Sequence, residues 1–187
     1  PAQLPARIAN KKNIKTINAF FDKKSSAMIK NKYGQMDFIT SHNVLAHIGN
    51  IQEVFKNIFS LLKNRGFFCF EVGYFLEVLK NNYFDTIYHE HLDYHHAAPL
   101  IKYLSELGFS IVNISTNKIQ GGSIRILCKK DIKVRIYAQA KNFLLKENNS
   151  IINKKSFLMK WSKNIHLNME QLHNIMKVYV KKNNKII

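Results

Sequence analysis

An amphipathic helix pattern that leads directly into a buried strand pattern is the feature that most constrains the fold. Ile51–Leu62 places its apolar residues on one helical face. After the turn Asn64-Arg65-Gly66, the run Phe67–Val72 is almost continuously apolar, as in a parallel strand that is covered on both faces. This succession indicates an α/β fold, in which helices cross over between neighbouring strands of one sheet.

The same alternation continues on both sides of this unit. Short apolar runs predict strands, and the segments with helical periodicity between them predict helices. The predicted strands are Ile14–Ile17, Asp37–Thr40, Ser110–Ser115 and Ser123–Lys129, and the predicted helices are Ser25–Lys32, Leu76–Leu79 and Pro99–Leu107. The last two strands should form a hairpin around Gly121-Gly122. Residues 138–182 are helical and basic in pattern, and a further strand is expected to begin at 185–187.

The amino-acid composition excludes several classes of protein. The 187 residues are 46% hydrophobic, which excludes intrinsic disorder as a description of the chain. Cys69 and Cys128 are the only cysteines, which excludes a disulfide framework and a four-cysteine zinc site. No apolar run approaches the roughly 20 residues that span a bilayer. We expect a cytoplasmic protein without a membrane partner.

The formal net charge of +17 is concentrated in the last third of the sequence. Residues 129–187 carry 14 basic and 3 acidic side chains, a balance that suits a polyanion such as nucleic acid. A solvated, lysine-rich surface has the same composition and needs no partner. No recognition-helix or zinc-finger pattern accompanies the charge. Nucleic acid is therefore not the expected partner, and a basic nucleic-acid-binding module is the alternative function.

One segment, residues 84–96, concentrates side chains that can carry chemistry. It holds His89, His91, His95 and His96 together with Tyr88, Glu90, Asp93 and Tyr94. A helical His-Glu-x-x-His metal site would need a histidine at position 93, although His91 and His95 could still share a helical face. Proton transfer is a second interpretation, since an imidazole takes up a proton near neutral pH. A polar loop with satisfied histidines is the third. We expect no metal here.

Four motifs occur in order along the chain. They are Ser41-His42-Asn43-Val44-Leu45-Ala46-His47-Ile48, Phe70-Glu71-Val72, Phe84-Asp85-Thr86-Ile87-Tyr88-His89-Glu90-His91-Leu92 and Gln120-Gly121-Gly122-Ser123-Ile124-Arg125. Together they resemble the S-adenosylmethionine-dependent C-methyltransferases that act on nucleotide-linked 4-keto-deoxysugars. The resemblance implies the Rossmann-like sheet of class I methyltransferases over residues 1–130, without its first strands and glycine-rich loop. It implies a helical segment over residues 131–187 that leads into a truncated C-terminal subdomain.

The resemblance also implies a mechanism for this transferase. The ketone at carbon 4 of the sugar acidifies the hydrogen on carbon 3, a base removes it, and the enolate attacks the sulfonium methyl group. By similarity, His91 would be the base, and Glu90 would place the base or a sugar hydroxyl. Tyr88 and His47 would contact the sugar and the oxyanion. For His47, a structural place at the N-terminus of a helix is the alternative.

Contacts with S-adenosylmethionine are expected from two places in the sequence. By the same resemblance, Asn18, Phe20 and Phe21 would lie beside the adenine. His42 or Asn43, which follow the next predicted strand, would also contact the cofactor. A core role for Phe20 or Phe21 is the alternative, because paired aromatic residues usually fill space in the interior.

The sequence departs from the family pattern in several ways. None of its seven glycines forms a Gly-x-Gly, and Gln120 stands where the family usually has histidine. The chain begins at Pro1 and ends at Ile187 within a predicted strand. The family's zinc would be bound only in an N-terminal domain that this sequence lacks. We therefore expect an internal fragment of a deoxysugar-biosynthesis enzyme, inactive in isolation and a monomer when intact. A non-catalytic relative that keeps the fold is a further alternative.

Overall fold

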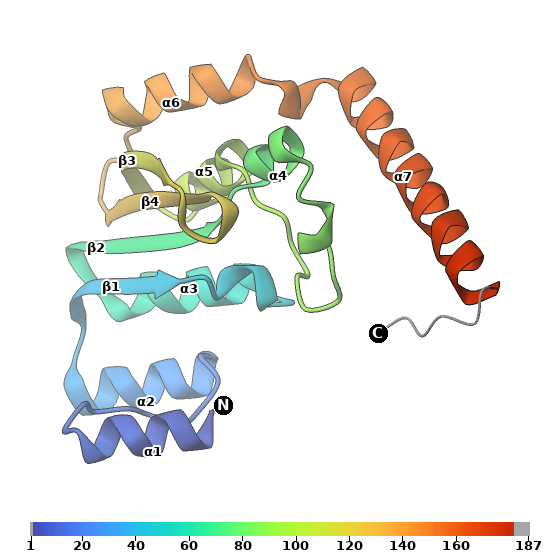
Figure 1. Ribbon diagram of the computed structural model, residues 1–187. Helices are drawn as coiled ribbons and strands as arrows, with labels where there is room; N and C mark the ends of the chain where they lie inside the picture. Colours follow the sequence, from blue (N-terminus) through green and yellow to red (C-terminus); the bar gives the residue numbers. More distant parts are fainter. Residues whose placement is uncertain (1, 182–187) are drawn as a thin grey trace.

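A computed structural model of the chain describes residues 2–181 and confirms an α/β fold (Figure 1). One sheet holds the strands, and helices surround it. The elements before the sheet's final hairpin are α1 (Gln3–Lys11), α2 (Lys23–Tyr33), β1 (Met36–His42), η1 (Leu45–His47), α3 (Ile51–Leu61), β2 (Leu62–Gly73), α4 (Phe75–Asn81), η2 (Phe84–Thr86) and α5 (Ala97–Glu106). Those that follow are β3 (Phe109–Asn117), η3 (Ile119–Gly121), β4 (Ser123–Lys130), α6 (Ala138–Asn148), η4 (Ile151–Asn153) and α7 (Lys155–Lys181).

The sheet has the strand order β1-β2-β4-β3. β1 and β2 run parallel, with Phe38 opposite Phe67, whereas β4 runs antiparallel to β2, with Cys69 opposite Leu127. β3 and β4 form an antiparallel pair, which confirms the predicted hairpin. The strands predicted around residues 37–40, 67–72, 110–115 and 123–129 are all confirmed, as are the helices that correspond to α2, α3, α4 and α5.

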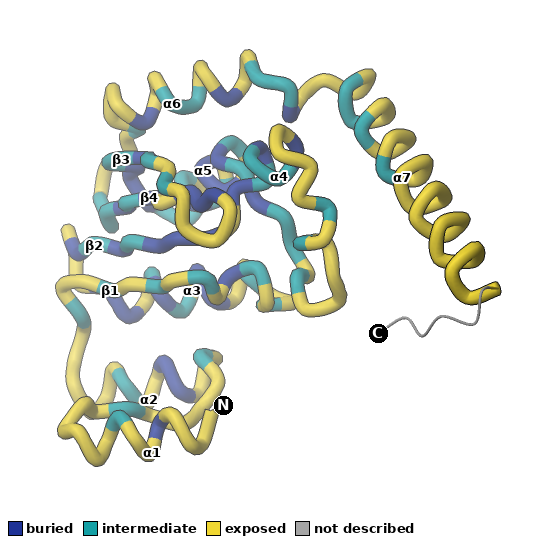
Figure 2. Tube along the Cα trace, viewed as in Figure 1, coloured by how far each residue is buried: buried dark blue, intermediate teal, exposed yellow. Residues whose placement is uncertain are grey.

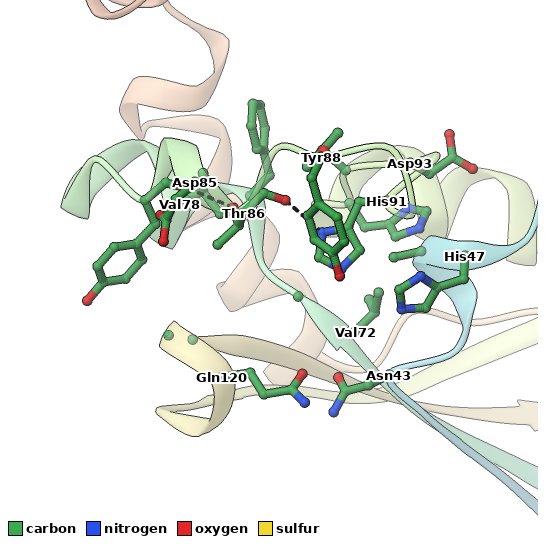
Figure 3. A pocket seen from close by; sticks show the side chains of 18 residues that line it. Asn43, His47, Val72, Val78, Asp85, Thr86, Tyr88, His91, Asp93 and Gln120 are labelled. Carbon is green, nitrogen blue, oxygen red and sulfur yellow. Dashed lines mark hydrogen bonds between the residues drawn. The ribbon is translucent and has the colours of Figure 1, made fainter. Parts of the chain in front are cut away.

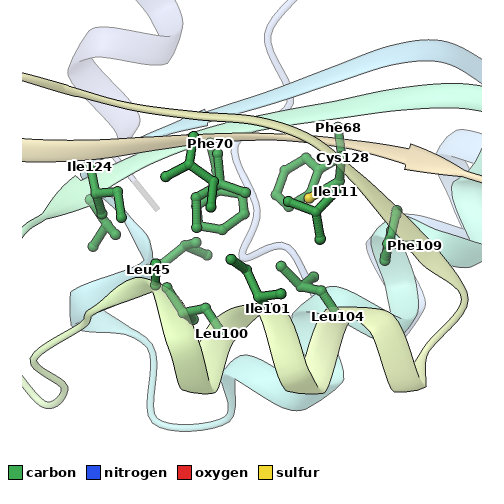
Figure 4. Close-up of a cluster of buried hydrophobic side chains, with 14 of the residues drawn as sticks. Leu45, Phe68, Phe70, Leu100, Ile101, Leu104, Phe109, Ile111, Ile124 and Cys128 are labelled. Carbon is green, nitrogen blue, oxygen red and sulfur yellow. The ribbon is translucent and has the colours of Figure 1, made fainter. Parts of the chain in front are cut away.

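The core lies between the sheet and the helices α3 and α5 (Figure 4). Ile101 and Leu104 of α5 point toward the sheet, where Phe68 and Phe70 of β2 are completely buried. Phe55 of α3 packs its ring against both phenylalanines, with ring centroids 6.1 and 5.8 Å away. The amphipathic helix and the apolar strand that the sequence predicts therefore pack against each other in the core.

The strand predicted at Ile14–Ile17 is wrong, because this segment is a loop between α1 and α2. The side chain of Asn10 donates to the carbonyl of Thr16 and accepts from its N–H, both at 2.9 Å. These two bonds satisfy the backbone much as a neighbouring strand would. The two isoleucines are 59% and 43% exposed, so no hydrophobic face requires a sheet here.

The turn predicted at residues 64–66 lies inside β2. Arg65 has a left-handed backbone, with φ at 66°, and the pairing with β1 shifts register between Met36 and Phe38. The predicted turn residues therefore lie at an irregularity of the pairing, between the first residue of β2 and the regular part of the strand that begins at Phe67.

The basic tail is helical, as predicted, although residues 149–154 interrupt it. α6 contacts β3 and α5, and its Ala140 is completely buried. α7 contacts η4 at its start, but every residue after Ile165 in the described part of α7 is exposed (Figure 2). The strand predicted at 185–187 lies outside the described residues. Within residues 2–181, no helix combines the length and the apolar content that crossing a bilayer requires.

Candidate active site

A cavity of about 400 Å³ opens at the carboxyl ends of β1 and β2 (Figure 3). Its walls come from the loop after β1, the end of β2, helix α4, residues 83–95 and the turn at residues 120–122. Ligands of open α/β sheets bind at this edge, because the loops that leave parallel strands converge there. The cavity therefore gathers segments that are distant in sequence, and all four motifs supply side chains or glycines to it.

His91 lines this cavity, and a hydrogen bond fixes the tautomer of its neutral ring. Its Nδ1 lies 2.8 Å from the backbone oxygen of Thr86 (Figure 3). A carbonyl oxygen can only accept, so Nδ1 carries the proton and neutral His91 keeps a lone pair on Nε2. The residue is half-buried, and its ring centroid is 4.5 Å from that of Tyr88. This is the form of imidazole that can take up a proton from a ligand.

His47, at the end of η1, is held in the same way. Its Nδ1 donates to the backbone oxygen of Glu90 over 2.8 Å, so its Nε2 is also unprotonated in the neutral state. The ring centroids of His47 and His91 are 5.0 Å apart. Figure 3 shows His47, His91 and Tyr88 beside one another. The structure thus brings together three of the residues that the sequence predicts as catalytic.

Glu90 contributes its main chain to this arrangement. The residue is exposed, and it is absent from the lining of the cavity, whereas its carbonyl orients His47. Glu90 lies in the turn directly before His91, and the N–H of His91 donates to the carbonyl of Tyr88. In this turn the main-chain carbonyl of Glu90, and not its carboxylate, bonds the ring of His47. A role for the Glu90 carboxylate remains a prediction.

Asn43 occupies the wall formed by the loop after β1. Its backbone is left-handed, with φ at 51°, and its N–H donates to the carbonyl of Glu71 over 2.9 Å. The side-chain oxygen Oδ1 is buried and has no hydrogen-bond partner among the described residues. Gln120, which is also left-handed with φ at 52°, points toward Asn43 from the opposite wall (Figure 3). An unpaired buried acceptor beside a cavity is suited to a ligand that donates a hydrogen bond.

The other predicted cofactor residues lie outside the cavity lining. His42 is exposed at the end of β1, and Asn18 and Phe20 are exposed in the loop after α1, where Phe20 is 72% exposed. Phe21 is partly buried against the hydrophobic core, as the alternative interpretation expects. Of the five residues predicted to contact the cofactor, the structure places Asn43 alone in this cavity.

Burial favours the neutral form of two further groups in the cavity wall. Desolvation lowers the pKa of His95 below its usual value, while the charge of Asp93 opposes that effect more weakly. Desolvation also raises the pKa of Tyr94. Both side chains line the cavity, so its inner wall carries an uncharged imidazole and an uncharged phenol at neutral pH.

An ion pair between the buried carboxylate of Glu71 and the half-exposed guanidinium of Arg125 stabilises the sheet next to the cavity. Glu71 is 3% exposed, and its Oε2 accepts from Arg125 at 2.7 Å and from Asn117 at 2.9 Å. Successive strand residues point to opposite faces of the sheet, so Glu71 faces away from Val72, which lines the cavity. The carboxylate in the second motif therefore links β2, β3 and β4, a role that sequence reasoning missed.

Several lining residues had no role of their own in the sequence analysis. They are Phe75, Val78, Tyr83, Asp85, Thr86 and Gln120. Asp93, Tyr94 and His95 also line the cavity, and they belong to the segment that the sequence singles out, so its density of polar and aromatic side chains was a usable signal. Phe75 and Val78 gave none, because an apolar residue on a helix has the same pattern whether it faces a core or a cavity. Within residues 2–181, no three His, Cys, Asp or Glu side chains gather as a metal site.

Comparison with known proteins identifies related sequences. The family described as the methyltransferase domain matches residues 4–114. The C-methyltransferase NovU of Streptomyces niveus is 36% identical over 124 residues, which are 66% of this chain and 30% of that protein. The chain thus spans less than a third of the length of this curated relative. The match includes most of the residues that build the cavity's framework of strands and helices.

Solved structures share the fold at low sequence identity. A SAM-dependent methyltransferase from Thermotoga maritima has a TM-score of 0.50 and 14% identity, covering 70% of this chain and 70% of its own. A chain from Galdieria sulphuraria, described as a sarcosine dimethylglycine methyltransferase, has a TM-score of 0.50 and 13% identity, covering 71% and 66%. At such identities the likeness shows the fold alone, and it is that of the class I methyltransferases.

Proposed function

Because the chain belongs to the methyltransferase domain family, we propose that the protein methylates a carbon atom of a nucleotide-linked 4-keto-deoxysugar. The relative from Streptomyces niveus is a C-methyltransferase, which supports carbon as the methyl acceptor. Methylation at carbon needs a carbanion or enolate, and hence a base that removes a proton next to a carbonyl group. The proposal therefore depends on the presence of such a base in the cavity.

The observation that carries the proposal is the fixed tautomer of His91. Its Nδ1–H is held by the carbonyl of Thr86, which leaves Nε2 as the basic nitrogen of a residue that lines the cavity. A neutral imidazole is the side chain best suited to accept a proton near neutral pH. His91 would take the proton from the carbon next to the ketone, and the main chain would hold the ring still while it does so.

The developing oxyanion needs a hydrogen-bond donor. Neutral His47 donates its only N–H to Glu90, so its Nε2 accepts rather than donates. Tyr88 lines the cavity, and its hydroxyl can donate to the oxyanion. We therefore assign oxyanion stabilisation to Tyr88 and assign to His47 the binding of a sugar hydroxyl through Nε2.

Asn43 is the residue that fits S-adenosylmethionine. Its buried Oδ1 lacks a partner, and the cofactor carries an ammonium group and hydroxyl groups that could donate to such an acceptor. Asn43 lies at the carboxyl end of β1, with His42 immediately before it. When bound, S-adenosylmethionine supplies an electrophilic methyl group. The residues of this chain then hold and align the sugar, and His91 generates the carbon nucleophile.

The proposal is tested by following both the methyl group and the proton. The protein is incubated with S-adenosylmethionine labelled with ¹³C at the methyl carbon and with a nucleotide-linked 4-keto-deoxysugar, and the product is examined by NMR. We expect the label on a ring carbon next to the former ketone. In D₂O without S-adenosylmethionine, we expect exchange of that carbon's hydrogen, and His91→Asn should abolish the exchange. A label found on oxygen or nitrogen would contradict the proposal.

A further inference from the structure

A buried carboxylate on α6 binds three donors that all belong to other elements. Glu147 is 2% exposed. Its Oε2 accepts from the hydroxyl of Tyr74 at 2.8 Å and from the N–H of Ala97 at 2.9 Å, and its Oε1 accepts from the N–H of Ala98 at 2.8 Å. Among the described carboxylates, only that of Glu71 is buried to a similar degree.

These donors lie at the edges of the cavity. Ala97 and Ala98 open α5, and they follow directly after the segment that carries His91. The first N–H groups of a helix have no partner within the helix and attract negative charge, which explains why a carboxylate is buried there. Tyr74 joins β2 to α4, and its own N–H donates to the carbonyl of Gly122 in the turn on the other side of the cavity.

The segment that carries His91 is therefore attached near its middle and at its C-terminal end. Toward its middle, the N–H of Leu92 donates to the carbonyl of Ala46, next to His47, over 2.8 Å. At its end, the carbonyl of His95 accepts from Phe75 at 2.9 Å, and Glu147 binds the residues that follow. Without Glu147, the amides that open α5 would lose their buried acceptor, and this end would be free to move.

We propose that Glu147 is a positioning residue for His91, which it fixes through the first turn of α5. This inference rests on the proposed function, since it concerns the residue assigned there as the base. The helix that bears Glu147 belongs to the basic tail, so the tail contributes to the geometry of the cavity without lining it. Misplacement of a catalytic group by about 1 Å can cost a hundredfold in rate.

The test compares Glu147→Gln with Glu170→Gln, whose carboxylate is exposed on α7. In Glu147→Gln the new amide group presents N–H to a buried donor, so we expect faster hydrogen exchange at Ala97 and Ala98. We expect the ¹⁵N resonances of the His91 ring to move toward those of a freely exchanging tautomer mixture. We expect kcat to fall by about ten- to a hundredfold, with KM for the sugar changed by less than threefold. Glu170→Gln should match the wild type in every measurement.

Two results would overturn the proposal. One is faster exchange at Ala97 and Ala98 while the His91 resonances and kcat stay at wild-type values, which is the outcome of a purely structural role. The other is unchanged exchange at both amides. If Glu147→Gln does not fold, Tyr74→Phe removes one of the three donors and should show the same changes in smaller size. If the wild type turns over no keto-sugar, the proposed function fails, while the exchange and ¹⁵N measurements still decide whether Glu147 orients His91.

Discussion

The rings of His47 and His91 lie with their centroids 5.0 Å apart, and each ring donates Nδ1–H to a backbone carbonyl. Both acceptors, on Glu90 and Thr86, belong to the segment that carries His91 itself. A single loop thus fixes the tautomer of two imidazoles that come from different parts of the chain. The rings differ in exposure, since His47 is exposed and His91 is half-buried. The two rings therefore share a tautomer and differ in how far each is exposed to solvent.

Replacing His91 with asparagine should remove the base and keep its orienting bond. The amide nitrogen of asparagine takes the place of Nδ1 and can still donate to Thr86, whereas nothing replaces Nε2. We expect kcat to fall by about 10² to 10⁴, the usual contribution of a general base, with unchanged affinity for S-adenosylmethionine. Turnover and isothermal titration calorimetry measure the two quantities.

The matched control for that substitution is His47→Asn, which again keeps the bond to the Glu90 carbonyl. It should cost about tenfold in kcat/KM, the effect of one lost hydrogen bond to the sugar. If the larger loss appeared at His47 instead, the roles of the two histidines would have to be exchanged.

The substitution Asn43→Gly tests the cofactor contact without straining the main chain. Asn43 has a positive φ, which glycine adopts at no steric cost, so the loop after β1 should keep its shape. The buried Oδ1 disappears, and we expect the Kd for S-adenosylmethionine to rise about tenfold, as for the loss of one hydrogen bond. The thermal unfolding midpoint should change by less than two degrees. Equal cofactor affinity in the variant and the wild type would remove Asn43 from the binding site.

The central phenylalanine of β2 should dominate the stability of the sheet. Phe70 is completely buried and contacts Phe55 and Phe68, so Phe70→Ala leaves a cavity and should lower the free energy of unfolding by about 3 to 5 kcal/mol. Phe38→Ala is the control, because Phe38 is 54% exposed on β1 and should cost less than about 1 kcal/mol. Urea denaturation measures both, and equal losses would place the core elsewhere.

The burial of His95 should make stability depend on pH in the weakly acidic range. An unfolded histidine titrates near 6.5, and desolvation lowers the pKa of folded His95 below that value. Between the two pKa values the unfolded chain binds more protons, so the free energy of unfolding falls as the pH falls through 6.5. Below the folded pKa the effect is complete. Urea denaturation at pH 7.5 and pH 5.5 should show this decrease, and His95→Gln should make it smaller.

The elements that the sequence predicts correctly are those whose own side chains determine them. In α3 the apolar residues recur with the period of a helix, in β2 they form an almost continuous run, and the packing of the two elements against each other agrees with both patterns. Ile14–Ile17 has the composition of a strand, but Asn10 satisfies its backbone from outside the segment. The residues of the segment itself give no sign of these bonds, because Asn10 lies outside it.

The residues of the candidate site also fall into those that the sequence predicts and those that it does not. Tyr88 and His91 are close in sequence within a distinctive motif, and His47 follows a predicted strand, so all three could be named in advance. The position of Gln120 opposite Asn43 could not be predicted. It depends on left-handed backbones in two loops that only the sheet brings together. Glu147 was also missed, since its donors are main-chain groups and a hydroxyl in other elements.

The carbonyls that hold the two histidines have a consequence for how such a site can evolve. Every residue type at positions 86 and 90 offers the same backbone oxygen, so the orientation of the imidazoles survives mutation there. The side chain of Thr86 nevertheless lines the cavity. A lineage could therefore exchange that side chain and reshape the wall that meets the substrate, while the proton-accepting nitrogen stays in place. The side chain of Thr86 can thus change with the substrate, while its carbonyl oxygen keeps His91 in the same orientation.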